Sequence, residues 1–473
     1  MNEKKRLLKN TGLIALGNSG TKVISFLLLP LYTSILKTTE YGNYDFIVTI
    51  GAFLLPIITF SMHEAMFRFI IDSNDNDDFG MIINHAMVLV LFGVVVLTIL
   101  IITIGVIFQI EYWYYILLYL ISIVMQTFSN SILRGMGLMK QYAIISSIKN
   151  CLQLILNVIM IVVLRMGLHG LLCALCFSEF LGFCFVGFQI KIWNYIKFRD
   201  LHKSKFQEML SYSLPLIPNS LCATIINLSD RIIIKNWLGS AANGVYTISC
   251  KFPSIIETNY HYFYNAWSES ASKYLKEGKE KAETFYKSLY VQLDNLVFSV
   301  VLMLVSAMPI LFRIFIRGEY VQGFDYVPFL MFAIYFDCIA KFYSGIFTAL
   351  KKTPIIAQST IIAAIVNIAM NICFIKKFGI YAAAISTLFA DAVLVIIRKR
   401  VAQKEIEFDH RLSCTLLKIA VAVLIFVLYD YNSGVKTALS MMIAIAYTLV
   451  FNRAMIQSMF NILLKKVQIR WFT

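Results

Sequence analysis

Long runs of apolar residues follow one another along almost the whole chain, separated by short polar segments. A run of about 20 apolar residues is long enough to cross the hydrocarbon core of a bilayer as a helix. The pattern predicts about fourteen membrane-spanning helices, at residues 10–36, 44–71, 82–109, 112–139, 142–165, 168–192, 210–236, 243–268, 286–316, 326–350, 355–376, 379–400, 413–430 and 434–453. Spans and short loops then use nearly the whole chain, so no soluble domain fits.

Composition supports an all-α polytopic membrane protein. Of the 473 residues, 59% are hydrophobic and 15% are charged, whereas a soluble domain carries about 25% charged residues. The formal charge of +15 would suit nucleic acid. The positive residues, however, gather in the loops between spans, where they orient the helices and meet anionic lipid headgroups. We therefore expect membrane lipids, and no nucleic acid, among the partners.

The loop lysines and arginines also give an orientation, because cytoplasmic loops carry the excess of positive charge. Successive loops alternate between rich and poor in these residues. The rich ones include Lys4–Lys9, Lys191–Lys205, Lys273–Lys281, Arg398–Arg411 and Lys465–Arg470. This places both termini in the cytoplasm.

A weak internal repeat divides the chain into two similar halves. Leu36, Gly42 and Tyr44 recur 202 residues later as Leu238, Gly244 and Tyr246. Six predicted spans separate the two copies, so the copies run in the same direction. This predicts two six-helix lobes related by a pseudo-two-fold axis along the membrane normal, with two further helices at the C-terminus. The expected parts are an N-lobe (1–192), a cytoplasmic amphipathic linker (193–209), a C-lobe (210–400) and a C-terminal part with two helices and a basic tail (401–473).

Charged residues lie inside several of the predicted spans, where each costs about 2.5–3.5 kcal/mol on insertion scales unless it faces protein or water. Two acid–base pairs, Glu64 with Arg68 and Asp337 with Lys341, are four residues apart and can pair on one helix face. The adjacent Asp230 and Arg231 point about 100° apart. Lys22 and Lys251 have no acid three or four residues away, so they need a partner elsewhere or an anionic ligand.

The order of several short motifs resembles polysaccharide flippases of the Wzx type, which are relatives of the lipid II flippase MurJ and of MATE exporters in the MOP superfamily. The motifs are Glu40–Phe46 (EYGNYDF), Glu64–Phe69 (EAMFRF), Leu133–Gly137 (LRGMG), Ser213–Pro218 (SLPLIP), Asp230–Arg231 and Leu350–Thr353 (LKKT). The pattern departs from the family after Gly379, where Ala382 replaces an expected glycine.

The resemblance implies a non-enzymatic protein of the bacterial plasma membrane. It would move undecaprenyl-pyrophosphate-linked oligosaccharide repeat units of O-antigen or capsule to the outer leaflet by alternating access, beside polymerase or glycosyltransferase partners. A pyrophosphate needs cations, and the intramembrane candidates are Lys22, Arg68, Lys149, Arg231, Lys251 and Lys341. Coupling to H⁺ or Na⁺ would use acids, for which the candidates are Glu64, Asp230, Glu257, Asp337 and Asp391.

Two other functions compete with a flippase. A MATE-type multidrug or metabolite antiporter would share the two-lobe plan, but it would favour an acidic cavity. A membrane glycosyltransferase or polymerase would carry an acidic catalytic cluster or a large outside domain, and the outward loops here are short. The nine cysteines lie mostly within apolar runs and lack CxxC spacing. We therefore expect no metal site and no cofactor.

Overall fold

The structure is a computed structural model, and it describes residues 26–73, 76–195, 202–406, 412–453 and 455–457. Within these ranges every regular element is a helix. The chain divides into two compact units, residues 1–247 and 248–473.

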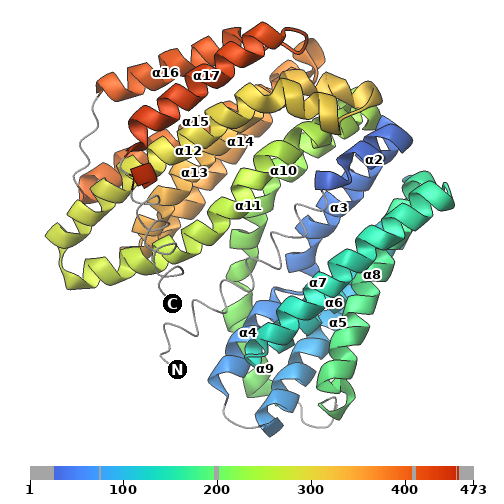
Figure 1. Ribbon diagram of the computed structural model, residues 1–473. Coiled ribbons are helices and arrows are strands. Elements are labelled where there is room, and N and C mark those ends of the chain that lie inside the picture. The colour runs from blue at the N-terminus through green and yellow to red at the C-terminus, as the bar shows by residue number, and fades with distance from the viewer. Residues whose placement is uncertain (1–25, 74–75, 196–201, 407–411, 454, 458–473) are drawn as a thin grey trace, which may run out of the picture. The chain divides into compact units, whose positions relative to one another are not determined.

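The first unit runs from α2 into the first turns of α11 (Figure 1). Its helices are α2 (Leu29–Ile35), α3 (Thr38–Ile58), α4 (Met62–Asp72), α5 (Asn76–Ile107), α6 (Trp113–Gly135), α7 (Met139–Val158), α8 (Gly167–Ile190), α9 (Lys203–Ser213), α10 (Leu216–Leu238) and α11 (Ser240–Glu277), with a π-helical turn η1 (Ile159–Val163) and a 3₁₀ turn η2 (Ile192–Asn194). The second unit begins inside α11. It continues through α12 (Lys279–Phe315), η3 (Gly318–Tyr326), α13 (Val327–Ala349), α14 (Thr353–Phe378), α15 (Ile380–Glu405), α16 (Leu412–Val427) and α17 (Gly434–Phe451).

Ten helices in the described ranges are long and apolar enough to cross a membrane. They lie where the sequence predicts spans, from Thr38–Ile58 to Gly434–Phe451. Helices α10 and α11 form at the seventh and eighth predicted spans and carry charged residues along their length, and α16 contains a shorter apolar stretch, Thr415–Val427. Of the first predicted span, only residues 26–36 belong to the described part of the chain. The protein is a multi-pass membrane protein.

The second predicted span, 44–71, is not a single helix. Helix α3 stops at Ile58, and Phe60 and Ser61 both adopt a left-handed conformation with φ near 49° before α4 starts. Such a conformation is uncommon for residues other than glycine. Pro56 lies in the last turn of α3, and its carbonyl accepts a hydrogen bond from the Ser61 N–H at 2.9 Å. The break itself, Thr59–Ser61, contains no glycine or proline, and the continuous apolar run predicted a single span there.

The core of the first unit lies where α6 meets α4 and α8. Met62, Met66, Ile132 and Leu172 are fully buried in it. In the second unit, α13 packs on α15 and α15 on α14 (Figure 1), while α12 packs on α17. Trp267 of α11 stacks on Phe342 of α13 with ring centroids 4.5 Å apart, and its indole N–H donates to the Phe342 carbonyl at 2.9 Å.

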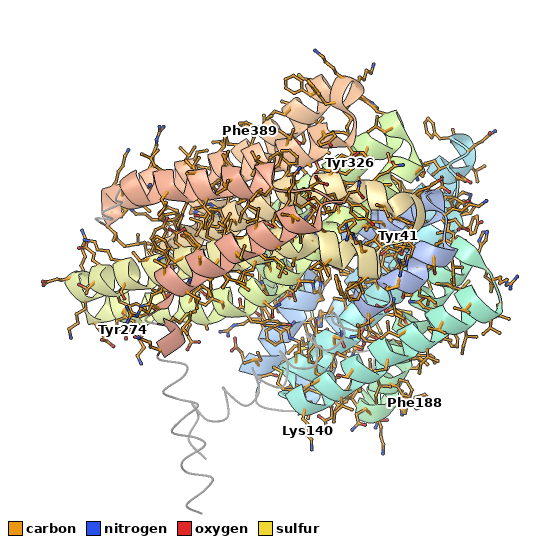
Figure 2. All side chains as sticks on the ribbon, turned by 45° about the horizontal axis from the view of Figure 1, so that its top comes forward. Tyr41, Lys140, Phe188, Tyr274, Tyr326 and Phe389 are labelled. Carbon is orange, nitrogen blue, oxygen red and sulfur yellow. The ribbon has the colours of Figure 1, made fainter. Side chains whose placement is uncertain are left out.

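The outer surfaces of both units are apolar. Phe188 of α8 is 71% exposed and Phe389 of α15 is 52% exposed; both are labelled in Figure 2. Within the span Phe79–Ile107, only 11% of the most apolar 18-residue stretch is buried inside the protein. Exposed apolar surface of this extent is stable against lipid and not against water.

Asp430 lies in the short turn between α16 and α17. Hydrogen bonds to its carboxylate from Lys436 Nζ and the Asn432 N–H lower the pKa of Asp430.

Candidate functional site

The predicted site residues are distributed over both units, and all but one fall in the described part of the chain. Lys22 lies outside the described residues. Arg68, Lys149, Arg231, Glu64 and Asp230 belong to the first unit, whereas Lys251, Glu257, Lys341, Asp337 and Asp391 belong to the second.

Arg231 of α10 makes a buried ion pair with Asp45 of α3. Its Nε lies 2.7 Å from Asp45 Oδ2, and its Nη1 donates to the Asn227 carbonyl at 3.0 Å. The neighbouring Asp230 is buried on another side of α10 and accepts a hydrogen bond from Tyr246 at 2.8 Å. The adjacent charges therefore have separate partners, as their angular separation predicts. Arg231 ties α10 to α3, whereas the sequence placed it among the candidate phosphate contacts.

The two copies of the predicted repeat contact each other just beside this pair. A Cβ added to Gly42 would overlap the Ser240 carbonyl oxygen, and one added to Gly244 would overlap the Thr38 carbonyl oxygen. The contact is reciprocal: each glycine meets the carbonyl of the residue four positions before the other glycine. Thr38 and Ser240 are 202 residues apart, as are Gly42 and Gly244, so both pairs occupy equivalent positions in the repeat. Two hydrogen bonds reinforce it, from Ser240 Oγ to Asn43 Oδ1 and from Asn243 Nδ2 to the Gly42 carbonyl, both at 2.7 Å.

Lys149 of α7 is paired with Glu179 of α8. The Nζ–Oε1 distance is 2.7 Å, and both side chains are largely buried. Beside them a Cβ added to Gly182 of α8 would come close to Gln126 Oε1, a buried atom with no hydrogen-bond partner. Lys149 is thus a cation already neutralised by its neighbour in the fold.

The charges of α4 pair differently from the prediction. Arg68 pairs with Asp72 at 3.3 Å, and Glu64 lies 3.7 Å from His63 Nε2, so the predicted Glu64–Arg68 pair was wrong. Both partners of the Arg68 pair are more than half exposed, which lets the long arginine side chain turn toward the helix end. Nearby, the Arg134 guanidinium lies 4.4 Å above the Phe67 ring.

In the second unit the structure brings three predicted site residues together. Lys341 Nζ lies 2.5 Å from Asp337 Oδ2 and 3.7 Å from Glu257 Oε1. The Asp337–Lys341 pair confirms the prediction, and Glu257 of α11 joins it from another helix. Two carboxylates face one ammonium, and the Lys341 side chain is 33% exposed. This cluster is the best candidate site in the described chain, since it is charged, partly accessible and assembled from separate helices.

Lys251 and Asp391 are the two other predicted site residues of the second unit. Lys251 is half-buried on α11, and Asp391 of α15 is buried. Each has an interaction partner. The sequence predicted that Lys251 is isolated because no acid stands three or four residues away on its own helix. That spacing says nothing about contacts with residues from other parts of the chain.

Two buried cations of the second unit were not among the predicted site residues. Lys418 of α16 lies 2.6 Å from Asp294 of α12, whose other oxygen accepts a 2.6 Å hydrogen bond from Tyr335. Arg398 of α15, which the sequence placed at the cytoplasmic end of the predicted span 379–400, is buried. It donates to carbonyl and hydroxyl oxygens on α13 and α14. The signal for Lys418 was a lone lysine within an apolar run.

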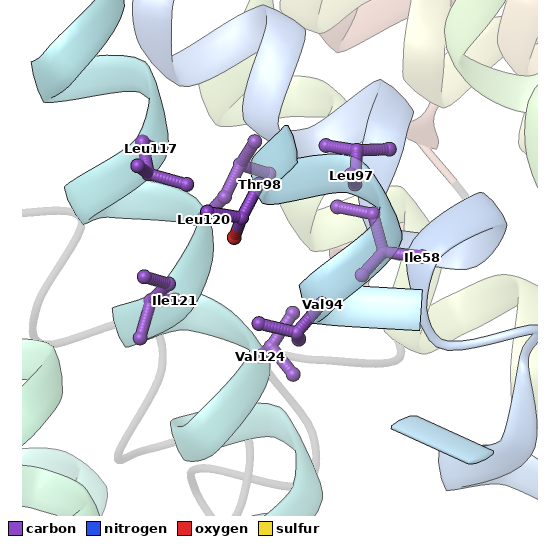
Figure 3. Close-up of a pocket in the computed structure, with 8 residues that line it drawn as sticks. All are labelled: Ile58, Val94, Leu97, Thr98, Leu117, Leu120, Ile121 and Val124. Carbon is purple, nitrogen blue, oxygen red and sulfur yellow. The ribbon is translucent and has the colours of Figure 1, made fainter. Parts of the chain in front are cut away.

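A small pocket between α3, α5 and α6 is not a binding site (Figure 3). Its volume is about 10 Å³, and aliphatic side chains form its wall apart from Thr98. A space of that size holds at most one water molecule, and apolar cavities stay dry.

Comparison with known proteins places the chain in a family. A model of the family described as "Polysaccharide biosynthesis protein" matches residues 7–268, which is more than half of the chain. The chain belongs to this polysaccharide biosynthesis family. No curated protein sequence matches it.

Solved structures identify the fold of this family member. The lipid II flippase MurJ in an inward closed conformation aligns with a TM-score of 0.74 at 13% identity, covering 95% of this chain and 99% of that one. An inward-facing multidrug resistance MATE transporter of the MOP superfamily aligns at 0.62 with 16% identity, covering 81% and 97%. A MOP superfamily transporter from Pyrococcus furiosus aligns at 0.60 with 17% identity, covering 85% and 96%. The chain therefore shares the fold of these transporters.

Proposed function

We propose that this protein is a flippase that moves an undecaprenyl-pyrophosphate-linked oligosaccharide repeat unit from the cytoplasmic to the outer leaflet of the bacterial plasma membrane. The observation that carries the proposal is the combination of a polysaccharide biosynthesis family match with the MurJ fold over 95% of the chain. Both termini would lie in the cytoplasm, and polymerases or glycosyltransferases would be its partners.

The cargo sets the chemical requirements. Each sugar hydroxyl or phosphate charge moved into hydrocarbon costs several kcal/mol, so the protein must provide a polar path. Rocking of the lobes about that path would give alternating access, with no covalent step.

The pyrophosphate would meet cations whose side chains are accessible. Arg68 and Lys341 have the more exposed side chains, 53% and 33% respectively, and we assign them to phosphate contact together with Lys22 and Lys251. Lys149 and Arg231 hold buried acids at 2.7 Å. Breaking such pairs costs about 3–5 kcal/mol, so we assign these two residues to helix packing.

Ion coupling is proposed at the Lys341 cluster. Asp337 and Glu257 together carry one more charge than Lys341 neutralises, and H⁺ or Na⁺ would balance that excess. Glu64, Asp230 and Asp391 are the remaining coupling candidates. Asp230 is the weaker of these, because it is buried against Tyr246.

A MATE-type antiporter is the second candidate function, since MATE structures share the fold and the Lys341 cluster has an acidic excess that would suit a cationic cargo. Against it, the MATE match leaves about a fifth of this chain uncovered.

Deleting the gene tests the proposal. A flippase mutant accumulates lipid-linked repeat units in the cytoplasmic leaflet and loses surface polysaccharide, and the wild-type gene restores both. Unchanged surface polysaccharide with increased sensitivity to cationic drugs would favour the antiporter. Purified protein in liposomes should also make a fluorescent lipid-linked sugar accessible to a lectin outside, and failure to do so would contradict flipping.

A further inference from the structure

The segment that joins α12 to α13 has an unusual backbone. It is η3, a 3₁₀ helix of nine residues (Gly318–Tyr326) that runs directly into α13. Runs of 3₁₀ helix longer than about four residues are uncommon, and such stretches often mark hinges. Tyr320 and Phe324 are buried, whereas Gln322 and Asp325 are exposed. η3 therefore lies on the surface of the second unit with one face against the protein.

Each end of η3 has a residue that lets the backbone bend. At its start Gly318 has a φ of 62°, in the left-handed region that only glycine adopts freely. At its end Pro328 has no N–H, so it cannot bond to the Phe324 carbonyl four residues earlier. That carbonyl accepts instead from the Val327 N–H and, at 2.8 Å, from the Tyr429 hydroxyl. A few residues at the ends of an element can absorb the rotation of a short segment.

The ring of Phe324 is held by the turn between α16 and α17. It stacks on Tyr429 with ring centroids 4.1 Å apart and lies edge-on to Tyr431 at 5.2 Å. Offset and edge-on aromatic pairs attract each other beyond the effect of the area that they bury. The turn is itself fixed to α12, because the Arg313 guanidinium donates to the Tyr431 carbonyl and lies 5.4 Å from the centroid of the Tyr431 ring. The turn thus fastens η3 to α12.

Phe324 covers a pair of buried rings. Phe312 of α12 contacts it edge-on, with centroids 5.5 Å apart, and stacks on Phe252 of α11 at 5.1 Å. Both rings are buried. From α11 the Ser249 hydroxyl also donates to the Gly323 carbonyl at 2.8 Å. η3 covers the end of the contact between α11 and α12, and moving η3 outward would uncover these rings.

The helix that follows η3 has attachments of its own. In α13 the Phe342 carbonyl accepts from Trp267 at 2.9 Å, and the Ala340 carbonyl and the Ser344 hydroxyl accept from Arg398 at 3.2 and 2.7 Å. None of these contacts involves η3, so η3 can move while α13 stays in place.

We propose that η3 is a lid over the end of the α11–α12 contact and that the α16–α17 turn latches it closed. When Phe324 leaves the two tyrosines, η3 turns about Gly318 and Pro328 and uncovers the rings of Phe312 and Phe252. Alternating access needs an end of the path that opens and closes; that this lid opens during transport rests on the proposed function.

Hydrogen exchange of the full-length protein in nanodiscs tests the latch without any substrate. Tyr429→Phe removes one hydroxyl and should speed exchange of the η3 amides about fivefold. Phe324→Ala removes the ring and should speed it by more than about tenfold. The matched control is Tyr326→Phe, because the Tyr326 hydroxyl makes no hydrogen bond with the described residues (the residue is labelled in Figure 2). It should leave the exchange unchanged.

Exchange along α13 should stay slow in every variant. Unchanged exchange of η3 in both Tyr429→Phe and Phe324→Ala would show that the turn does not hold η3. A parallel rise along α13 would show that Phe324 supports the fold of the whole unit. Either result would overturn the lid.

A reversible crosslink tests whether the lid opens during transport. Gln322→Cys on η3 and Asn432→Cys on the turn are exposed positions beside the latch, so the latch rings stay in place. After replacement of the native cysteines by alanine, bis-methanethiosulfonate reagents of increasing length join the pair. The crosslink should lower the rate of lectin-accessible product at least about tenfold, and reduction should restore it. Each single-cysteine variant treated with the same reagent is the control.

The outcomes separate the lid from the proposed function. Flipping at the full rate by the crosslinked protein would remove the lid from the transport cycle and leave the flippase function standing. If the wild-type protein makes no lectin-accessible product, the proposed function fails, and hydrogen exchange still decides whether η3 is a latched lid.

Discussion

Gly42 of α3 and Gly244 of α11 meet backbone to backbone, and each occupies the same position in its copy of the 202-residue repeat. The repeat was read from short turn motifs. In the folded chain the two copies pack against each other at these glycines. Any residue larger than glycine would overlap the opposite backbone at either position.

Gly42→Ala should destabilise the protein. The added methyl would overlap the Ser240 carbonyl and approach the Gly244 N–H, and overpacking of this kind costs about 1–3 kcal/mol. The measurement is thermal unfolding in detergent. Gly434→Ala is the control, because a Cβ there has no neighbour within 4 Å. An unchanged melting temperature for Gly42→Ala would show that the helices separate freely at this contact.

Asp45→Asn and Arg231→Gln should each destabilise the protein, by about 3–5 kcal/mol, because each leaves a buried charge unpaired. The double variant should lose less than the sum of the two single variants, since both charges are gone. A double-mutant cycle on unfolding free energies measures the coupling between the residues. Additive losses would mean that the 2.7 Å contact contributes nothing.

Lys341→Gln should lower flipping at a normal protein level. The side chain is partly exposed, so its loss affects stability less than the loss of Arg231, yet it leaves Asp337 and Glu257 without their counter-charge. We expect at least about a tenfold drop in the rate of lectin-accessible product. Lys279→Gln, whose side chain is 70% exposed on α12, is the matched control. Equal rates for the two variants would remove Lys341 from the transport site.

Arg398→Lys should behave as a severe change although it keeps the charge. The guanidinium reaches Ser344 of α13 and both Ser359 and Thr360 of α14, and a lysine ammonium cannot reproduce that planar fork. Each lost charged hydrogen bond is worth about 1.5–3 kcal/mol. A melting temperature within error of wild type in the purified variant would show that these bonds are replaceable.

The fold could be predicted in large part from the sequence, because apolar runs of span length have few alternatives in a membrane. The i,i+4 pairing of Asp337 and Lys341 also followed from helical spacing. The α3–α4 break did not, since Phe60 and Ser61 have no sequence signature of a left-handed turn.

The candidate site was less predictable, since helical spacing reports only on neighbours within one helix. Asp45 stands in the motif EYGNYDF, but nothing local shows that its partner is Arg231, 186 residues away. In the same way Lys251 appears isolated on its own helix and still has a partner in the fold. Contacts between helices decide which intramembrane cations remain available, and those contacts are set by tertiary packing.

The Asp45–Arg231 pair also limits how the gene can be divided. A cut between α8 and α10, at the midpoint suggested by the repeat, would leave the aspartate on one fragment and the arginine on the other. Each piece made alone would carry an orphaned charge, so such fragments should accumulate only when produced together. Hybrid proteins that join halves of two relatives at this point should fold when one half supplies an acid at position 45 and the other supplies a base at position 231.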